Sequence, residues 1–477
     1  MRRLLAATLT AALLAPAAAQ AHNGARVFVT TPDRALQLSD QGSVPFTRGA
    51  PTISVDPRQT FQTMEGWGAS ITDSSAAVLY RLDKRTRDRA MTALFKTDGL
   101  SYLRQPMGAS DFVDEPHYTY DDVPAGQTDY GMRRFSIAHD EAQILPLLRQ
   151  ALQLNPRLKV MATPWSPPAW MKTNGSLIGG RLIDDPRIYR AYADYFVRFI
   201  KGYARAGVPI DAVTVQNEPQ NRNPSGYPGM DMPVAQEAKL IEQLGPALQR
   251  AGLRTKILGY DHNWSEHPND VANTPPGEHP ETEYPTLLLQ SPASRWIAGT
   301  AYHCYSGDAS RMSALHDAFP NKDIYFTECS GSHGESDTPE QIFAGTLGWH
   351  ADNLIIATAR NWAKTLVNWN LALDPAGGPH NGGCGTCTGV ITVGPGDTFS
   401  YNAEYFTLGH AARFVQPGAV RIASSEGAAF RNRDGTIALI VHNTTDAARP
   451  VRVGTGPRGA AYTLPPGALA TFVWGDR

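Results

Sequence analysis

Cysteine is scarce in this chain of 477 residues, which has only Cys304, Cys329, Cys384 and Cys387. So few cysteines exclude a disulfide scaffold, and stability must come mainly from a large core. No charge sign dominates: the formal net charge is −2, which gives no argument for nucleic acid or an anionic membrane as partner. Charged residues make up 18% and apolar residues 42% of the chain, the composition of a globular protein.

Long apolar runs are missing beyond the N-terminus. There, Arg2 and Arg3 precede the apolar stretch Leu4 to Ala15, and Ala19-Gln20-Ala21 fits the small-x-small cleavage rule. We therefore expect a signal peptide over residues 1–21, a secreted or periplasmic mature chain and no membrane segment after cleavage. A short N-terminal core helix is the alternative.

What the sequence does contain is an alternation of short apolar runs with longer helical ones between residues 60 and 375. Such a pattern is typical of βα units around a parallel sheet. Eight strands are predicted, so we expect an α/β fold, a (β/α)₈ TIM barrel. They are Met64–Ala69, Tyr102–Met107, Lys159–Trp165, Ala212–Asn217, Lys256–Tyr260, Ile297–His303, Ile324–Glu328 and Thr365–Asn370.

Amphipathic stretches separate these strands, and β-rich sequence flanks the barrel. The helical stretches are Asp140–Leu152, Arg187–Ala206, Val234–Ala251 and Pro339–Ala359. Strands separated by turns are predicted at Thr436–His442 and Ala470–Trp474. A similar pattern of strands and turns is present at Arg26–Val55. We expect an antiparallel β-sandwich built from both termini. The predicted division is a signal peptide at 1–21, N-terminal sandwich strands at 22–58, the barrel at 59–400 and the rest of the sandwich at 401–477.

Two glutamates follow predicted strands at the end of the barrel where catalysis takes place. Strand four runs into Asn217-Glu218-Pro219, and strand seven ends in Glu328. Glycoside cleavage with retention needs two carboxyls about 5 Å apart, one as acid and one as nucleophile. Because both cannot easily ionise together, we expect the pKa of the acid to be raised. The alternative is that each glutamate is a solvated loop residue.

Longer motifs resemble glycoside hydrolase family 30, the glucosylceramidase family, and most of all its bacterial secreted members. Ordered motifs cover residues 60 to 420, nearly the whole mature chain. The similar segments are the runs at 66–73, 103–112, 164–175, 216–219 and 369–379. The resemblance implies a retaining β-glycosidase with Glu218 as acid/base and Glu328 as nucleophile.

The resemblance also implies sugar contacts from Asp111, Trp165, Asn217 and Trp369. Asn217 can hydrogen-bond the sugar 2-hydroxyl. Asp111 can accept from two hydroxyls, and the tryptophans offer faces to sugar C–H groups. Arg104, at the end of strand two, can keep Glu328 ionised. The alternatives are a core salt bridge for Arg104 and plain barrel packing for the tryptophans.

His303 and Tyr305 match the family's His-x-Tyr, and we expect them to orient Glu328 or to line the leaving-group side. His303 has no companions at metal-ligand spacing, so neither a metal nor a cofactor is expected.

The chain departs from the lysosomal pattern at residues 380–387. Asn381 is a candidate for the sugar-binding asparagine of that loop. Cys384 and Cys387 suit a loop-stiffening disulfide, with a redox pair or half a zinc site as alternatives. Cys304 and Cys329 could pair or be buried thiols.

The predicted function is hydrolysis of a β-glucoside, glucan or glycolipid, of the glucosylceramidase or β-glucosidase type. An endo-β-1,6-glucanase and a β-xylosidase are alternatives within the family. A non-catalytic carbohydrate-binding barrel is the alternative of a different class. Exo or endo action and the oligomeric state stay open, because they depend on loops over the barrel mouth.

Overall fold

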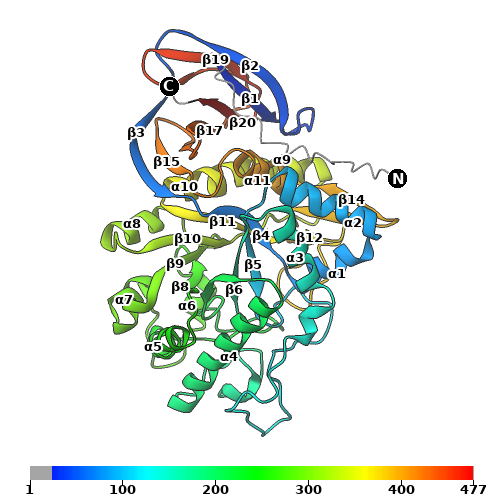
Figure 1. Ribbon diagram of the computed structural model, residues 1–477, viewed down its shortest axis with the longest axis vertical. Coiled ribbons are helices and arrows are strands. Elements are labelled where there is room, and N and C mark those ends of the chain that lie inside the picture. The colour runs from blue at the N-terminus through cyan, green and yellow to red at the C-terminus, as the bar shows by residue number, and fades with distance from the viewer. Residues whose placement is uncertain (1–23, 476–477) are drawn as a thin grey trace, which may run out of the picture.

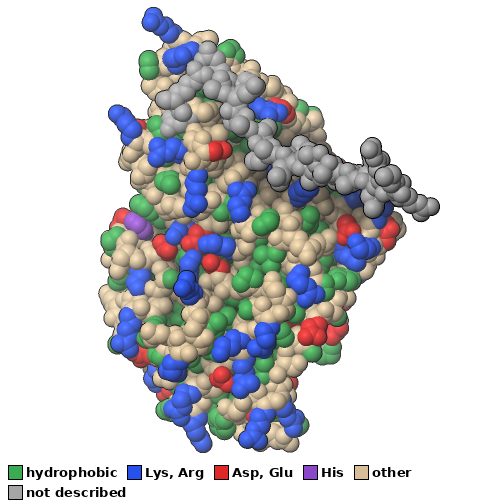
Figure 2. Space-filling view, viewed as in Figure 1, with side chains coloured by type: hydrophobic (Ala, Val, Ile, Leu, Met, Phe, Trp, Pro, Cys, Tyr) green, Lys and Arg blue, Asp and Glu red, His purple; other side chains and the backbone are tan. Residues whose placement is uncertain are grey.

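The computed structural model describes residues 24–475, which form a barrel of strands and helices beneath a smaller β-rich part (Figure 1). The predicted signal peptide lies outside the described residues. No helix among the described residues has the length and apolar content needed to span a bilayer. Figure 2 shows lysine and arginine side chains scattered over one face of the molecule rather than gathered into one patch.

Eight parallel strands close into a barrel in the order β10-β11-β4-β5-β6-β7-β8-β9. The eight predicted strands correspond one to one with these eight, and the predicted TIM barrel is confirmed. The strands are β4 (Gly66–Ser70), β5 (Tyr102–Pro106), β6 (Lys159–Thr163), β7 (Ile210–Thr214), β8 (Lys256–Asn263), β9 (Ile297–His303), β10 (Asp323–Glu328) and β11 (Ala363–Asn370).

The barrel interior is a packed core, and ion pairs occupy the end of the barrel where its strands begin. Side chains such as Met161, Leu258 and Val367 fill the interior. At the N-terminal ends of the strands, Glu65 accepts from Lys159 and Lys256, each at 2.8 Å. Burial raises the pKa of Glu65, but these lysines outweigh it and lower the pKa to about 2. Only the C-terminal ends of the strands therefore remain for a site.

Helices cover the outside of the barrel. Helix α4 buries the aromatic face of Tyr192, Phe196 and Phe199, while the Asp185 side chain caps its first turn by accepting from the Arg187 amide. The helices are α1 (Asp73–Arg81), α2 (Lys84–Met91), α3 (Ile144–Leu154), α4 (Pro186–Arg205), α5 (Val234–Arg250), α6 (Pro268–Ala272), α7 (Tyr284–Gln290), α8 (Ser310–Ala318), α9 (Pro339–Trp349), α10 (Ala357–Arg360) and α11 (Ala403–Ala412).

Two helical predictions need correction. The stretch predicted from Asp140 becomes regular helix only at Ile144, because the buried Asp140 carboxylate instead accepts from the Tyr120 and Tyr203 hydroxyls, at 2.6 and 2.5 Å. The stretch Pro339–Ala359 is interrupted by a π-helical segment at His350–Ile356, where His350 bonds Asn368 of β11 at 3.0 Å. Side-chain hydrogen bonds to distant elements override local periodicity at both places.

Nine strands form the second part as one hydrogen-bonded ring, in the order β1-β2-β19-β18-β3-β15-β16-β17-β20. Both termini contribute: β1 pairs with β2 and β20, so the predicted split β-domain is confirmed. The strands are β1 (Gly24–Thr30), β2 (Ser39–Arg48), β3 (Ile53–Thr63), β15 (Val420–Ser424), β16 (Ala428–Arg431), β17 (Thr436–His442), β18 (Arg449–Gly454), β19 (Arg458–Leu464) and β20 (Leu469–Gly475).

The two parts share packed surface. Trp67 of β4 is fully buried, meets Phe430 of β16 edge-on at 5.8 Å, and donates its indole N–H to the Val415 carbonyl at 3.1 Å. Burial of one such side chain contributes on the order of 2–3 kcal/mol. A small sheet of β12 (Ala372–Leu373), β13 (Ile391–Gly394) and β14 (Thr398–Tyr401) leads from β11 to α11.

Candidate active site

Glu218 lies in the loop after β7, in a backbone conformation that glutamate rarely adopts. Its φ is +47°, a left-handed conformation of the kind that costs on the order of 1–3 kcal/mol and clusters at functional sites. Two backbone hydrogen bonds hold the loop: the Glu218 amide donates to the Asp261 carbonyl at 3.0 Å, and the Asn217 amide donates to the Pro164 carbonyl at 2.8 Å. The Asn221 amide group donates to Glu218 Oε2 at 3.0 Å. The carboxylate is thus fixed at the barrel mouth.

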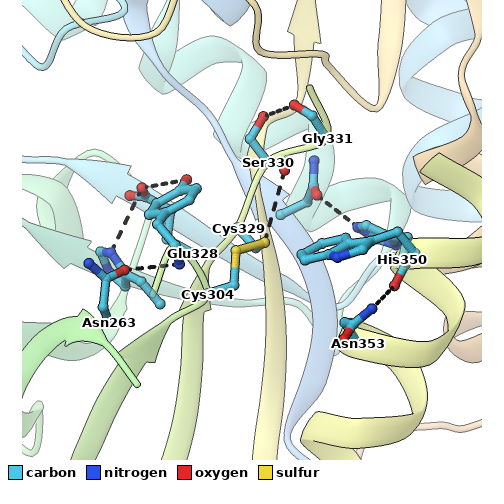
Figure 3. Close-up of a disulfide and its surroundings, with 12 residues drawn as sticks. Asn263, Cys304, Glu328, Cys329, Ser330, Gly331, His350 and Asn353 are labelled. Carbon is cyan, nitrogen blue, oxygen red and sulfur yellow. Dashed lines mark hydrogen bonds and ion pairs between the residues drawn. A yellow bond between two sulfur atoms is a disulfide. The ribbon is translucent and has the colours of Figure 1, made fainter. Parts of the chain in front are cut away.

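Glu328 is the last residue of β10, and its carboxylate is held from two sides. Arg104 Nη1 donates to Oε2, and the Tyr305 hydroxyl donates to Oε1 at 2.9 Å. Burial raises the pKa of Glu328, while His303 and Arg104 oppose that rise. Figure 3 shows Glu328 beside the disulfide between Cys304 and Cys329. That disulfide ties β9 to β10 one residue beyond His303 and one beyond Glu328.

Arg104 is fully buried under the site. Its Nη2 donates to Asn217 Oδ1 at 2.7 Å and to Asp261 Oδ2 at 2.9 Å, and its guanidinium lies 4.9 Å from the Trp165 ring centroid. A buried guanidinium needs such partners, because an unpaired one would cost several kcal/mol. Arg104 therefore connects the loop that carries Glu218 to the strand that carries Glu328.

Sequence reasoning missed Asp261, the centre of the buried network. Its carboxylate accepts from Arg104 and from the hydroxyls of Thr163, Thr214 and Thr327, at 3.0, 2.7 and 2.7 Å. These contacts overcome burial and hold the pKa of Asp261 well below its usual range. The signal was present: the run Asp261-His262-Asn263 ends β8, the position from which barrel strands supply functional side chains.

His303 joins this network to the acid candidate. Its Nε2 lies 3.1 Å from Asp261 Oδ1, and its Nδ1 lies 3.2 Å from Glu218 Oε1 and 3.8 Å from Glu328 Oε1. Burial lowers the pKa of His303, but the carboxylates of Glu328, Asp261 and Glu218 outweigh it and raise the pKa to about 9. At neutral pH the ring is an imidazolium that donates to both Asp261 and Glu218.

The pKa of the acid candidate, Glu218, differs from the sequence-based expectation. We expected it to be raised. Burial raises the pKa of Glu218, but the His303 contact outweighs it and lowers the pKa to about 2. Glu218 and His303 therefore hold one proton between them, and in the unliganded site it resides on Nδ1 of His303. The sequence gives no sign of this shared proton, because Glu218 and His303 are brought together only when the barrel closes.

A bell-shaped pH dependence of kcat/KM follows from this arrangement. Cleavage needs the shared proton, so activity should be lost as the pH rises through the His303 pKa, near 9 rather than near 6.5. Cleavage also needs ionised Glu328, and because burial raises the pKa of Glu328, the acid limb should lie at higher pH than an ordinary glutamate would give. In His303→Gln only Glu218 can hold the proton, so the alkaline limb should move to lower pH, because a carboxylic acid is a stronger acid than the imidazolium that it replaces. If the alkaline limb of His303→Gln lay at the same pH as that of the wild type, the claim that Glu218 and His303 share one proton would be wrong.

A cavity of about 400 Å³, here called the barrel-mouth cavity, contains Glu218, Glu328 and the sugar-binding candidates. Trp165 and Trp369 lie nearly parallel with ring centroids 5.1 Å apart, and Phe112 meets Trp369 edge-on at 5.8 Å. Both tryptophans are almost fully buried, so most of each ring packs within the barrel, although both residues line the cavity.

Asp111 lines this cavity and lies against the loop of the second disulfide, between Cys384 and Cys387. Burial raises the pKa of Asp111 well above its usual range, and the charge of Glu328 adds to the rise. A Cβ on Gly383 would come within 2.2 Å of Asp111 Oδ2, and the φ of Gly383 is +69°. Only glycine allows the loop to approach the carboxylate so closely.

Asn381 is brought near the site without facing it. Its backbone amide donates to the Asp111 carbonyl at 2.7 Å, but its side-chain amide is directed to the Glu115 carbonyl, at 3.4 Å. The remaining candidates, Asp111, Trp165, Asn217, Tyr305 and Trp369, all line the barrel-mouth cavity, and His303 lies behind it.

Glu218, His303 and Glu328 also have the composition of a small metal site. One ligand atom from each lies within 4.8 Å of the others, the one such trio within residues 24–475. A cation there would have to displace the Tyr305 hydroxyl and the His303 proton, next to the Arg104 guanidinium. The positive charge of the site is thus already supplied by protein groups, so the arrangement suits paired carboxylate chemistry better than metal binding.

Comparison with known proteins agrees with the observed division into a barrel and a β-rich part. Residues 64–415 match the model of the glycosyl hydrolase family 30 TIM-barrel domain, and residues 418–472 match that of the family's beta sandwich domain. An endo-1,6-beta-D-glucanase of Neurospora crassa is 30% identical over 458 residues, which cover 92% of this chain and 90% of the relative.

Two further relatives differ in their substrates. The lysosomal acid glucosylceramidase of Mus musculus is 28% identical over 88% of this chain and 83% of its own length. The solved structure of an endo-beta1,6-glucanase superposes with a TM-score of 0.84 at 31% identity, covering 95% of this chain and 99% of that one.

Proposed function

The chain belongs to glycosyl hydrolase family 30, and on that premise we propose that it cleaves β-glucosidic bonds with retention, Glu328 acting as nucleophile and Glu218 as acid/base. The observation that carries the proposal is the separation of the two carboxylates, which approach within 4.8 Å. Retaining enzymes hold their carboxyls about 5 Å apart, whereas inverting enzymes leave about 6.5–9.5 Å for a water molecule.

In the first step Glu328 attacks the anomeric carbon while the leaving oxygen takes a proton from Glu218. Glu218 is supplied with this proton by His303, across the 3.2 Å contact between His303 Nδ1 and Glu218 Oε1. After the step, Glu218 and His303 together hold no acidic proton. Formation of the ester removes the charge of Glu328. In the second step Glu218 takes a proton from water, which attacks the same carbon and releases Glu328.

The neighbouring residues have positioning and binding roles in this proposal. Arg104 donates a hydrogen bond to one carboxylate oxygen of Glu328 and Tyr305 donates to the other. These two bonds fix the orientation of the carboxylate for attack. Asn217 accepts from Arg104 through Oδ1, so its amide N–H groups are free to bind the sugar 2-hydroxyl. Asp111 hydrogen-bonds sugar hydroxyls in the cavity, which Trp165 and Trp369 also line.

The substrate that we propose is a β-1,6-linked glucan, because relatives with that activity match the chain over nearly its full length. Glucosylceramide is the second candidate, supported by the 28% identical mouse relative. We further propose that the protein acts outside the cytoplasm, on the basis of the signal-like residues 1–21.

A hydrolysis screen tests the activity directly. Wild-type protein is incubated with β-1,6-glucan, glucosylceramide, and aryl β-glucoside and β-xyloside, and the first-formed sugar is followed by NMR. We expect glucan and aryl β-glucoside to be cleaved with the β-anomer appearing first, because two inversions restore the configuration. An α-anomer formed first, or no cleavage of any β-glucoside, would overturn the proposal.

A further inference from the structure

The pairing between β9 and β10 becomes irregular just before its last pair, in which Glu328 lies opposite His303. Thr327 is an extra residue on β10, because two steps along β10 there correspond to one step along β9. In a regular strand the side chains of Thr327 and Glu328 would face opposite sides of the sheet. The bulge lets both reach the buried network, in which Thr327 donates to Asp261 at 2.7 Å. Glu328 is thus placed where regular strand pairing is interrupted.

Beyond this last pair, backbone hydrogen bonds join each strand to its other neighbour. The amide of Trp264, which follows β8, donates to the His303 carbonyl at 3.1 Å. The Trp369 amide of β11 donates to the Cys329 carbonyl at 2.7 Å. The disulfide between Cys304 and Cys329 is the covalent link between β9 and β10 at this point. It directly follows His303 on one strand and the last residue of β10 on the other.

The disulfide lies behind the site rather than in it. Cys304 is 8% exposed and Cys329 is fully buried. Both belong to the large apolar core, not to the cluster that fills the barrel, and neither is among the described residues that line the barrel-mouth cavity. Figure 3 shows the disulfide between Glu328 on one side and His350, in the π-helical segment after α9, on the other. A substrate in the cavity would therefore not touch it.

Three consecutive residues at the end of β9 contact the end of β10. His303 Nδ1 lies 3.8 Å from Glu328 Oε1. Cys304 is bonded to Cys329, and the Tyr305 hydroxyl donates to Glu328 Oε1 at 2.9 Å. Since side chains of an extended segment alternate, His303 and Tyr305 face the site while Cys304 faces away from it. A bond at Cys304 therefore fixes both flanking side chains relative to Glu328.

We propose that the Cys304–Cys329 disulfide is a positioning device for the reaction, which holds His303 and Tyr305 against Glu328 so that the nucleophile keeps its orientation and the imidazolium its distance. The proposal rests on the proposed function and deepens it. Positioning of this kind matters because a displacement of about 1 Å at a reacting centre can cost on the order of a hundredfold in rate.

The groups around His303 show which interaction the disulfide controls. The ring faces Glu328 from β10, Asp261 and His262 from β8, Glu218 from the loop after β7, and Tyr305, with Arg104 of β5 bonded to two of these carboxylates. Of the carboxylates, only Glu328 lies on the strand that the disulfide joins to β9. Burial lowers the pKa of His303, and the charge of Glu328 opposes it and raises that pKa. A more distant Glu328 should therefore lower the pKa of His303 and, with it, the alkaline limb of activity.

The test compares Cys304→Ala/Cys329→Ala with wild type on an activated aryl β-glucoside. Loss of orientation should lower kcat at least about tenfold while KM stays within about threefold. Because the attraction between two charges falls with distance, the alkaline limb should move to lower pH by about one pH unit. A disulfide that only stabilised the fold would lower the unfolding temperature and leave kcat and the alkaline limb unchanged.

The matched control is Cys384→Ala/Cys387→Ala, which removes the other disulfide. The loop of that disulfide lies against Asp111, so its loss should appear in KM, and the alkaline limb should stay at the wild-type pH.

The control variant also provides a second measurement, since it keeps only the disulfide in question. Protein produced in the presence of a phosphine, and so with both thiols free, should show a low kcat. Oxidation by glutathione disulfide, which leaves as two glutathione thiols, should raise kcat as Cys304 and Cys329 become resistant to alkylation. This measurement decides the matter if the alanine variant does not fold.

A kcat within about twofold of its disulfide-bonded counterpart, in the alanine variant and in the reduced protein, would overturn the proposal. An alkaline limb that does not move in either would overturn it as well. Wild-type protein that cleaves no β-glucoside would instead overturn the proposed function itself.

Discussion

Replacing Glu328 with glutamine should lower kcat at least a hundredfold on every β-glucoside and leave the fold intact. An amide cannot attack the anomeric carbon, and groups of this kind typically supply about 10²- to 10⁴-fold or more. The fold should persist because Arg104 keeps Asn217 and Asp261 as partners. Steady-state rates and thermal unfolding of the variant measure the two parts of this expectation.

The matched control for this substitution is Glu404→Gln. Glu404 is also a buried glutamate, 1% exposed, but it accepts from Thr388 outside the barrel-mouth cavity, and an amide oxygen can still accept there. We expect it to retain most activity. If Glu328→Gln kept more than about a hundredth of the wild-type rate, the assignment of the nucleophile would be wrong.

Replacing Glu218 with alanine should separate substrates by their leaving groups. A leaving group that departs easily as an anion needs little protonation, so an activated aryl β-glucoside should still be cleaved in the first step at a rate within about tenfold of wild type. A sugar or alkyl leaving group should lose at least about a hundredfold, because its oxygen must be protonated as it departs. Pre-steady-state release of the aryl group, compared with turnover of a β-1,6-diglucoside, measures the difference.

Azide should restore turnover to Glu218→Ala and yield the β-glycosyl azide, since an anion needs no base to attack the intermediate. With Glu328→Ala an anion can attack only from the vacated face, and the product would be the α-azide. Equal loss on both substrate types without azide rescue would contradict the role of Glu218. A β-azide from Glu328→Ala would mean that the two glutamates have exchanged roles.

Much of the fold was predictable because parallel strands buried on both faces are local apolar runs. The runs Lys256–Tyr260 and Ile297–His303 are visible as such in the sequence. The carboxyl ends of strands four and seven then give the approximate place of Glu218 and Glu328. The positive φ of Glu218 and its position four residues beyond the end of β7 were not predictable, since they depend on a backbone bond to Asp261.

Electrostatics set the limit of the sequence-based site prediction. The expected raised pKa of the acid depends on which groups face it, and the imidazolium of His303 reverses the expected direction. Asp261 was missed because its importance comes from Arg104, His303 and three threonines on other strands, none of them near it in sequence. Long-range contacts of this kind exist only after barrel closure.

The most direct measurement of the central claim is the location of the covalent intermediate. Glu218→Ala lacks the base of the second step, so the glycosyl group should accumulate when this variant is mixed with an activated aryl β-glucoside. Rapid acid quenching, proteolysis and mass spectrometry then identify the labelled peptide. The account predicts one added glucosyl residue on the peptide that contains Glu328. A label on any other residue, or none despite a burst of released aryl group, would contradict it.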